Sequence, residues 1–232
     1  MFFGRLHLPV SPPGVPAGLW ADVTVNRILV IAAAVLAILS LRDYLQLQPL
    51  LAGSLLRARG NIEIEHSVSQ ARNRNRCAFA GGFILCILAD RYRLYPAEFI
   101  AELPAHYRVA AILGVLAAFI LLRKFLYVMI NTVSRPKLDS ESRLAVHRAL
   151  YNYCLAVLPL MLVSVMVLWL FRAQDGAVRI VLWVELIVFW FITLLREGQI
   201  LQSKHTGFQT FLYLCGLELL PVAALVISAV FL

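Results

Sequence analysis

Six apolar segments constrain the fold of this 232-residue chain more than any other feature. They lie at about Leu19–Leu41, Arg76–Leu94, Tyr107–Ile130, Tyr151–Phe171, Ala177–Leu195 and Phe208–Leu232. A helix needs about 20 apolar residues to cross the ~30 Å hydrocarbon core, and the second segment is the weakest of the six by this measure. Because no segment alternates with period two, a transmembrane barrel is disfavoured. The sequence predicts an all-α polytopic membrane protein, a bundle of about six transmembrane helices.

Composition and charge fit the same class of protein. Hydrophobic residues make up 61% of the chain and charged residues only 15%, whereas a soluble domain has about a quarter charged residues. The formal net charge of +8 is also found in nucleic-acid binders, but here the cations gather between the apolar segments. We therefore expect the lipid bilayer as partner and no nucleic acid.

The positions of the cations predict the orientation. In an alternating six-helix bundle, the loops after the first, third and fifth spans share one side. Together with the ends of the spans next to them, they hold 14 of the 21 Lys and Arg residues. Basic loops stay in the cytoplasm, so this side is predicted to be cytoplasmic and both termini non-cytoplasmic. The longer cytoplasmic loops are predicted at about 42–75 and 131–150. In the second of these, Ser140 can begin a helix that leads into the fourth span.

Two parts of the chain differ from the regular spans. Residues 1–18 form a proline-containing N-terminal segment, and 19–232 form a single transmembrane domain whose first span begins too late for an ordinary cleaved signal. In the 42–75 loop, DYLQLQPLLAGSLLRARG has leucines at loosely helical spacing. This stretch lies on the membrane surface, or it forms an irregular loop that Pro49 interrupts, and both alternatives stay open.

Four ionisable residues within the predicted spans form a candidate intramembrane polar cluster: Arg123, Lys124, Glu185 and Glu218. A charge in hydrocarbon costs a few kcal/mol unless it is paired or hydrated. Adjacent helix positions point about 100° apart, so one of the two cations can face protein while the other reaches the interface. We expect Arg123 or Lys124 to pair with Glu218 or Glu185. A pair that only fixes helix register is favoured over a proton relay.

Two prolines lie within predicted spans. Pro159 and Pro221 each remove one backbone hydrogen bond and are predicted to kink their helices. Such broken helices line cavities in some transporters, although simple kinks are the favoured interpretation here.

No motif points to catalysis. HExxH and GxSxG are absent, the four cysteines have no metal-ligand spacing, and all five histidines lie outside the spans or at their edges. A metal shared by His66, His147 and His205 is geometrically possible, but their spacing is not specific. We expect no cofactor and no metal, and a non-enzymatic protein is favoured.

The closing stretch FQTFLYLCGLELLPVAAL also resembles the signature of a family. That signature joins a Leu-Tyr-Leu-Cys run, here Leu212 to Cys215, to a Glu-x-x-Pro, here Glu218 and Pro221. The chain thereby resembles an uncharacterised multi-pass inner-membrane family typical of Bacteroidota, which is a domain of unknown function. The resemblance covers about residue 20 to the end. It implies a helical bundle in a bacterial inner membrane and no activity.

Two functions follow as hypotheses. The first is a scaffold or accessory subunit of an envelope complex, with a membrane-protein partner or a second copy of the chain. The second is a small proton- or ion-coupled carrier or channel that uses Glu185 and Glu218. Replacing Glu218 by Gln separates them, because a scaffold tolerates the neutral isostere and a proton relay does not.

Overall fold

The computed structural model describes residues 20, 23–56, 68–133, 140–202 and 207–231, and these residues are almost entirely helical. The elements are α1 (Thr24–Leu56), α3 (Val68–Arg91), α4 (Glu98–Glu102), α5 (Ala105–Val133), α6 (Ser140–Leu170), α7 (Asp175–Gln202), α8 (Gly207–Leu214), the π-helix η2 (Cys215–Leu219) and α9 (Leu220–Phe231). No strand occurs within these ranges, so the predicted all-α class is confirmed.

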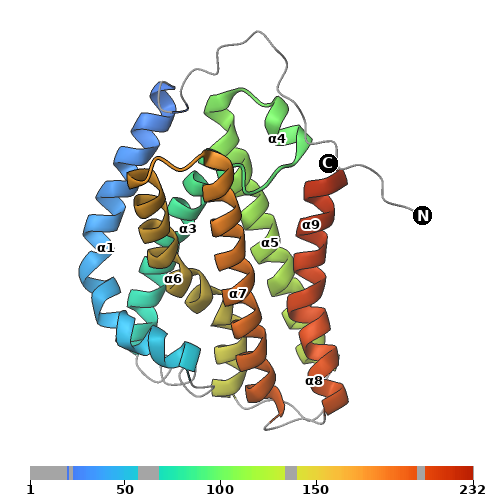
Figure 1. Ribbon diagram of the computed structural model, residues 1–232. Coiled ribbons are helices and arrows are strands. Elements are labelled where there is room, and N and C mark those ends of the chain that lie inside the picture. The colour runs from blue at the N-terminus through green and yellow to red at the C-terminus, as the bar shows by residue number, and fades with distance from the viewer. Residues whose placement is uncertain (1–19, 21–22, 57–67, 134–139, 203–206, 232) are drawn as a thin grey trace.

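The long helices run side by side in alternating directions. Figure 1 shows α1, α5 and α7 descending through the bundle, while α3, α6 and the continuous α8–η2–α9 segment ascend. The short helix α4 joins α3 to α5 at the upper end, where α1 also begins and α9 ends. Helix α3 packs on α1, α5 and α6, and α7 packs on α6 and α8.

Five of the helices are long and apolar enough to cross a membrane, judged by length and composition. Those stretches are Thr24–Leu55, Ala105–Ile130, Val146–Leu170, Asp175–Gln202 and Gln209–Phe231. Among the described helices, α3 is the long one that does not meet this measure, because its N-terminal part contains three arginines and two asparagines. The weakness of the second predicted span is thus a property of a real helix that lies among α1, α5 and α6.

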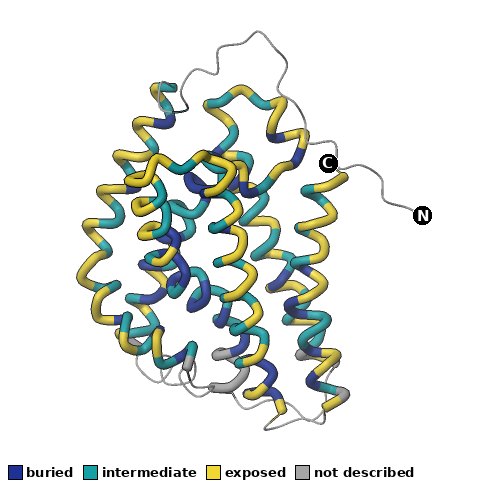
Figure 2. The backbone as a smooth tube through the Cα atoms, viewed as in Figure 1, coloured by how far each residue is buried: buried dark blue, intermediate teal, exposed yellow. Residues whose placement is uncertain are grey.

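The outer surface of the bundle is strongly apolar. In Figure 2 the exposed positions follow the outward faces of the helices and the buried positions lie toward the centre. Large apolar side chains are among the most exposed, including Ile38, Leu39, Trp169 at 76% and Phe231 at 80%. Water would make such a surface aggregate, whereas acyl chains solvate it.

Several helices are longer than the apolar segments that predicted them. Helix α1 continues through Pro49 to Leu56, so the described part of the expected 42–75 loop is helical at both ends. Figure 1 shows the last part of α1 turning across the lower end of the bundle. There Leu47 and Leu51 pack against Cys77 and Leu155, because residues four apart share one helix face. These leucines face protein rather than lipid.

The second expected loop, 131–150, is shortened in the same way. Helix α5 continues to Val133, and α6 begins at Ser140 and runs without a break to Leu170. The first turns of α6 contain Glu141, Arg143, Leu144 and Ala145, which have good helix propensity that apolar content alone does not register. Residues 134–139 lie outside the described part of the chain.

Candidate functional site: a buried arginine between two glutamates

Arg123 is the centre of a polar cluster within the lower half of the bundle. Its side chain comes from α5 and is only 4% exposed. Nε of Arg123 donates to Oε1 of Glu218 over 2.9 Å, and Nη2 donates to the same oxygen. Nη1 donates to the carbonyl oxygen of His147 over 2.6 Å, and Nη2 also reaches the carbonyl of Val146 at 3.2 Å. The guanidinium therefore ties α5 to the first turns of α6 and to η2.

A second carboxylate meets the same guanidinium. Glu197 on α7 is 0% exposed, and its Oε1 lies 3.6 Å from Nη2 of Arg123. Neither oxygen of Glu197 accepts a hydrogen bond from the described residues. Two acidic groups thus share one cation, and the cluster joins four segments: α5, α6, α7 and η2.

Glu218 is held by an irregularity in its helix. Residues Cys215–Leu219 form a single π turn, in which the backbone N–H of Leu220 donates to the carbonyl of Cys215. Pro221 follows directly and has no N–H to donate, so the wider turn replaces the regular ladder where the proline would break it. Glu218 is 3% exposed, and the π turn directs its carboxylate into the bundle.

The other two residues of the expected cluster lie elsewhere. Lys124 is exposed on the outer face of α5, as the turn between adjacent helix positions requires when Arg123 faces inward. Glu185 lies on α7, half-buried, where one of its oxygens accepts a hydrogen bond from the hydroxyl of Ser164 on α6. The structure therefore brings Arg123 and Glu218 together and leaves Lys124 and Glu185 outside the cluster.

Pro159 interrupts the backbone ladder within α6 without ending the helix. A proline removes the bond to the carbonyl four residues earlier, which here belongs to Leu155. The hydroxyl of Tyr44 on α1 donates to that carbonyl over 3.0 Å. The gap in α6 is thus filled by a side chain from α1, which binds the two helices together.

Glu197 was not expected from the sequence, since the fifth apolar segment ends near Leu195. The helix continues to Gln202, and Ile200 and Leu201 are buried beside Glu197. Their spacing of three and four residues from Glu197 places all three on one helix face, and this pattern could have predicted that Glu197 is buried. No comparable pattern in the sequence marks Arg74, which is fully buried in the second turn of α3 with Nη2 donating to Oδ1 of Asn75 over 3.0 Å.

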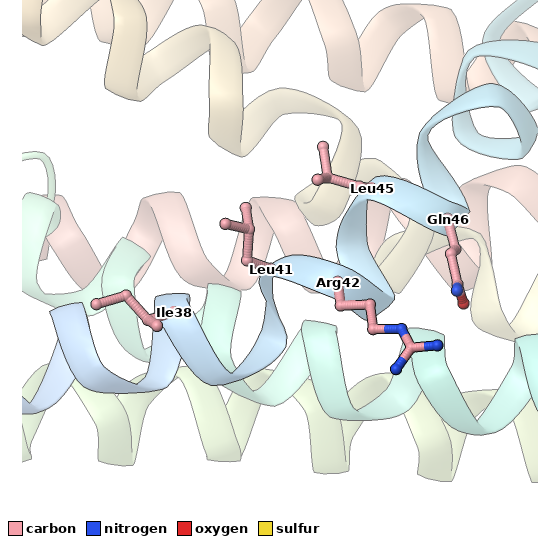
Figure 3. A pocket seen from close by; sticks show the side chains of 5 residues that line it. All are labelled: Ile38, Leu41, Arg42, Leu45 and Gln46. Atoms are coloured by element: carbon pink, nitrogen blue, oxygen red, sulfur yellow. The ribbon is translucent and has the colours of Figure 1, made fainter.

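Beyond the cluster, a ligand could bind at a metal site or in a surface groove. Within the described ranges, no group of three or more His, Cys, Asp or Glu side chains is placed to hold a metal ion. His66 and His205 lie outside those ranges. One open groove follows the bend of α1 and is lined by Ile38, Leu41, Arg42, Leu45 and Gln46 (Figure 3). All of its lining residues come from one helix, so it is a concavity of the outer surface.

The fold and the cluster define a class: a multi-pass helical membrane protein whose helices are tied together by a buried arginine–glutamate centre. The chain belongs to the family described as a domain of unknown function (DUF4271), whose model matches residues 28–227. This match includes Arg123, Glu197 and Glu218. No curated protein and no solved structure matches the chain.

Proposed function

We propose that this protein is a non-enzymatic scaffold or accessory subunit of a complex in the bacterial inner membrane. The observation that carries the proposal is how Arg123 uses its donors: they bind the carboxylate of Glu218 and two backbone carbonyls of α6. Because its hydrogen bonds and ion pairs link four helical segments, the cluster has a structural role: it fixes these segments relative to one another. A rigid bundle of this kind presents a fixed surface to a partner, which is either another membrane protein or a second copy of the chain.

The topology that fits this proposal has six crossings, with both termini on the non-cytoplasmic side. The alternating directions of the helices in Figure 1 support it. Helix α3 needs fewer apolar residues than a lipid-exposed span because α1, α5 and α6 surround it. The end of the bundle that carries Arg72, Arg76, Arg148 and Arg196 then faces the cytoplasm.

A small proton-coupled carrier is the second candidate, and one feature favours it. Glu218 lies in a π turn, and such turns are frequent at functional sites. A carrier that uses Glu185 together with Glu218 has weaker support, since Glu185 accepts a hydrogen bond from Ser164 and lies outside the cluster.

Chemical crosslinking in native membranes, followed by affinity purification of the tagged full-length chain, tests the scaffold function. We expect a partner in near-stoichiometric amount, retained by the Glu218→Gln variant. A tagged multi-pass protein of similar abundance serves as the control for non-specific capture. Purified protein in liposomes with an internal pH dye is expected to give no proton flux. A flux that Glu218→Gln abolishes overturns the scaffold in favour of the carrier.

A further inference from the structure

The structural role of the cluster does not explain why Glu197 is part of it. Its side chain is completely buried, yet neither carboxylate oxygen accepts a hydrogen bond from any described residue. Glu218, by contrast, accepts two hydrogen bonds from Arg123. A buried ionised carboxylate without donors is very unfavourable, so the ionised form of Glu197 does not fit its surroundings.

The charge balance of the cluster leads to the same conclusion. Glu197 and Glu218 both approach Nη2 of Arg123, one at 3.6 Å and the other in hydrogen-bond contact. With both acids ionised, one positive charge faces two negative charges, and one negative charge remains uncompensated inside the bundle. Two carboxylates that share a site cannot both ionise easily, and one of them retains a proton.

Within the described part of the chain, no second cation lies within ion-pair distance of either carboxylate. Among the described residues, Arg123 is the cation that pairs with either carboxylate. Its own α5 neighbour, Lys124, is exposed. Tyr151 and Cys154 of α6 lie within electrostatic reach of Arg123, and Arg148 of α6 lies within reach of His147. His147 stacks on the ring of Tyr127, with ring centroids 4.4 Å apart.

We propose that Glu197 and Glu218 form a binding site for one proton, which resides on Glu197 at neutral pH. Glu197 is then a neutral acid, Glu218 is the carboxylate that faces Arg123, and the cluster carries no net charge. The proton comes from water at the lower end of the bundle, since Glu197 lies little more than one turn from the C-terminal end of α7. This inference does not depend on the scaffold function, because a proton can be held permanently or exchanged.

Infrared spectroscopy of the full-length protein in lipid nanodiscs tests the site. A protonated carboxylic acid gives a carbonyl band separate from that of a carboxylate, and ¹³C labelling of glutamate shifts only the glutamate bands. We expect the wild-type protein at neutral pH to show a protonated glutamate band that Glu197→Gln removes. The exposed Glu98→Gln variant is the matched control and should leave the band unchanged. A band that survives Glu197→Gln unchanged, or the absence of any such band in the wild type, overturns the proposal.

A second variant tests the charge balance that underlies the proposal. In Glu218→Gln the carboxylate that competes for Arg123 is gone, so Nη2 of Arg123 can donate to Glu197 and Glu197 should ionise. Its protonated band should then disappear even though Glu197 is still present. Persistence of that band in folded Glu218→Gln protein contradicts the idea of a shared proton. The wild-type labelling result stands on its own if either variant fails to fold.

Discussion

Arg123 and Glu218 lie 95 positions apart in the chain, yet Nε of the arginine donates to Oε1 of the glutamate over 2.9 Å in the buried centre of the bundle. The contact closes the C-terminal segment onto α5. Its position explains why a chain rich in apolar residues retains an arginine within a span. A charged side chain in hydrocarbon is costly unless it is paired. Helix arrangements that separate Arg123 from Glu218 are therefore disfavoured, and the pair favours the one arrangement in which they meet.

Removing the arginine should therefore cost more than removing either acid. Arg123→Leu leaves the carboxylate of Glu218 and two α6 carbonyls without donors, and we expect a loss of about 3–5 kcal/mol in the free energy of unfolding. Glu218→Gln should cost less, because Glu197 can still face Arg123. Unfolding in mixed micelles with increasing SDS measures both values.

The control is Glu185→Gln, which changes an acid in α7 that lies outside the cluster and should cost under about 1 kcal/mol, since an amide oxygen can still accept from Ser164. The double variant Arg123→Leu/Glu218→Leu should lose less than the sum of its two single variants. Strict additivity would show that the two side chains do not stabilise the protein through their contact.

Much of the fold could be predicted because its signal is local. Long apolar runs require helices in a bilayer, and the all-α class and the positions of the helices follow from that requirement. The ends of the helices could not be predicted in this way. Beyond Leu41 and Leu195 the chain turns polar, and what keeps α1 and α7 helical there is packing of Leu51 and Leu201 against distant residues.

The site shows the same division. The cost of charge in hydrocarbon singled out Arg123 and Glu218 from the sequence. It did not single out Glu197, which lies beyond the apolar run, and it gave Glu185 the same weight as Glu218. The choice between them depends on the π turn at Cys215–Leu219 and on which face of α7 is turned toward Arg123, and both are tertiary features.

Gly81 lies at the contact between α3 and α6, whereas Gly114 on α5 has open space beside it. Substitutions at the two glycines should therefore change the stability in opposite directions. A Cβ atom at Gly81 would lie 3.2 Å from Cδ2 of Leu158 and 3.6 Å from Cδ2 of Leu155. Gly81→Val should therefore force the helices apart and cost about 1–3 kcal/mol. Gly114 has open space around the corresponding position, so Gly114→Ala should stabilise α5 by up to about 1 kcal/mol. Thermal unfolding in nanodiscs compares the two; equal effects would place Gly81 outside a close helix contact.

The crossing of α3 can be tested with single cysteines. In a background without the four native cysteines, Arg72→Cys near the start of α3 and Arg93→Cys just beyond its end are both exposed positions. If α3 crosses the membrane, a membrane-impermeant maleimide added outside intact cells should label position 93 and spare position 72. Permeabilised cells should show labelling at both. Labelling of both positions from one side would reduce the number of crossings to five.

The hydrogen bond from Tyr44 to the carbonyl of Leu155 predicts that the stability lost on replacing Tyr44 depends on whether Pro159 is present. Tyr44→Phe removes the hydroxyl that fills the gap left by Pro159, and a buried carbonyl without a donor costs about 1–3 kcal/mol. In a Pro159→Ala background the new N–H at position 159 can donate to Leu155 itself, because the regular helix bond is restored. Tyr44→Phe should then cost almost nothing. SDS unfolding of the two single variants and the double variant measures this coupling. An equal loss in both backgrounds would mean that Tyr44 stabilises α1 through its ring alone.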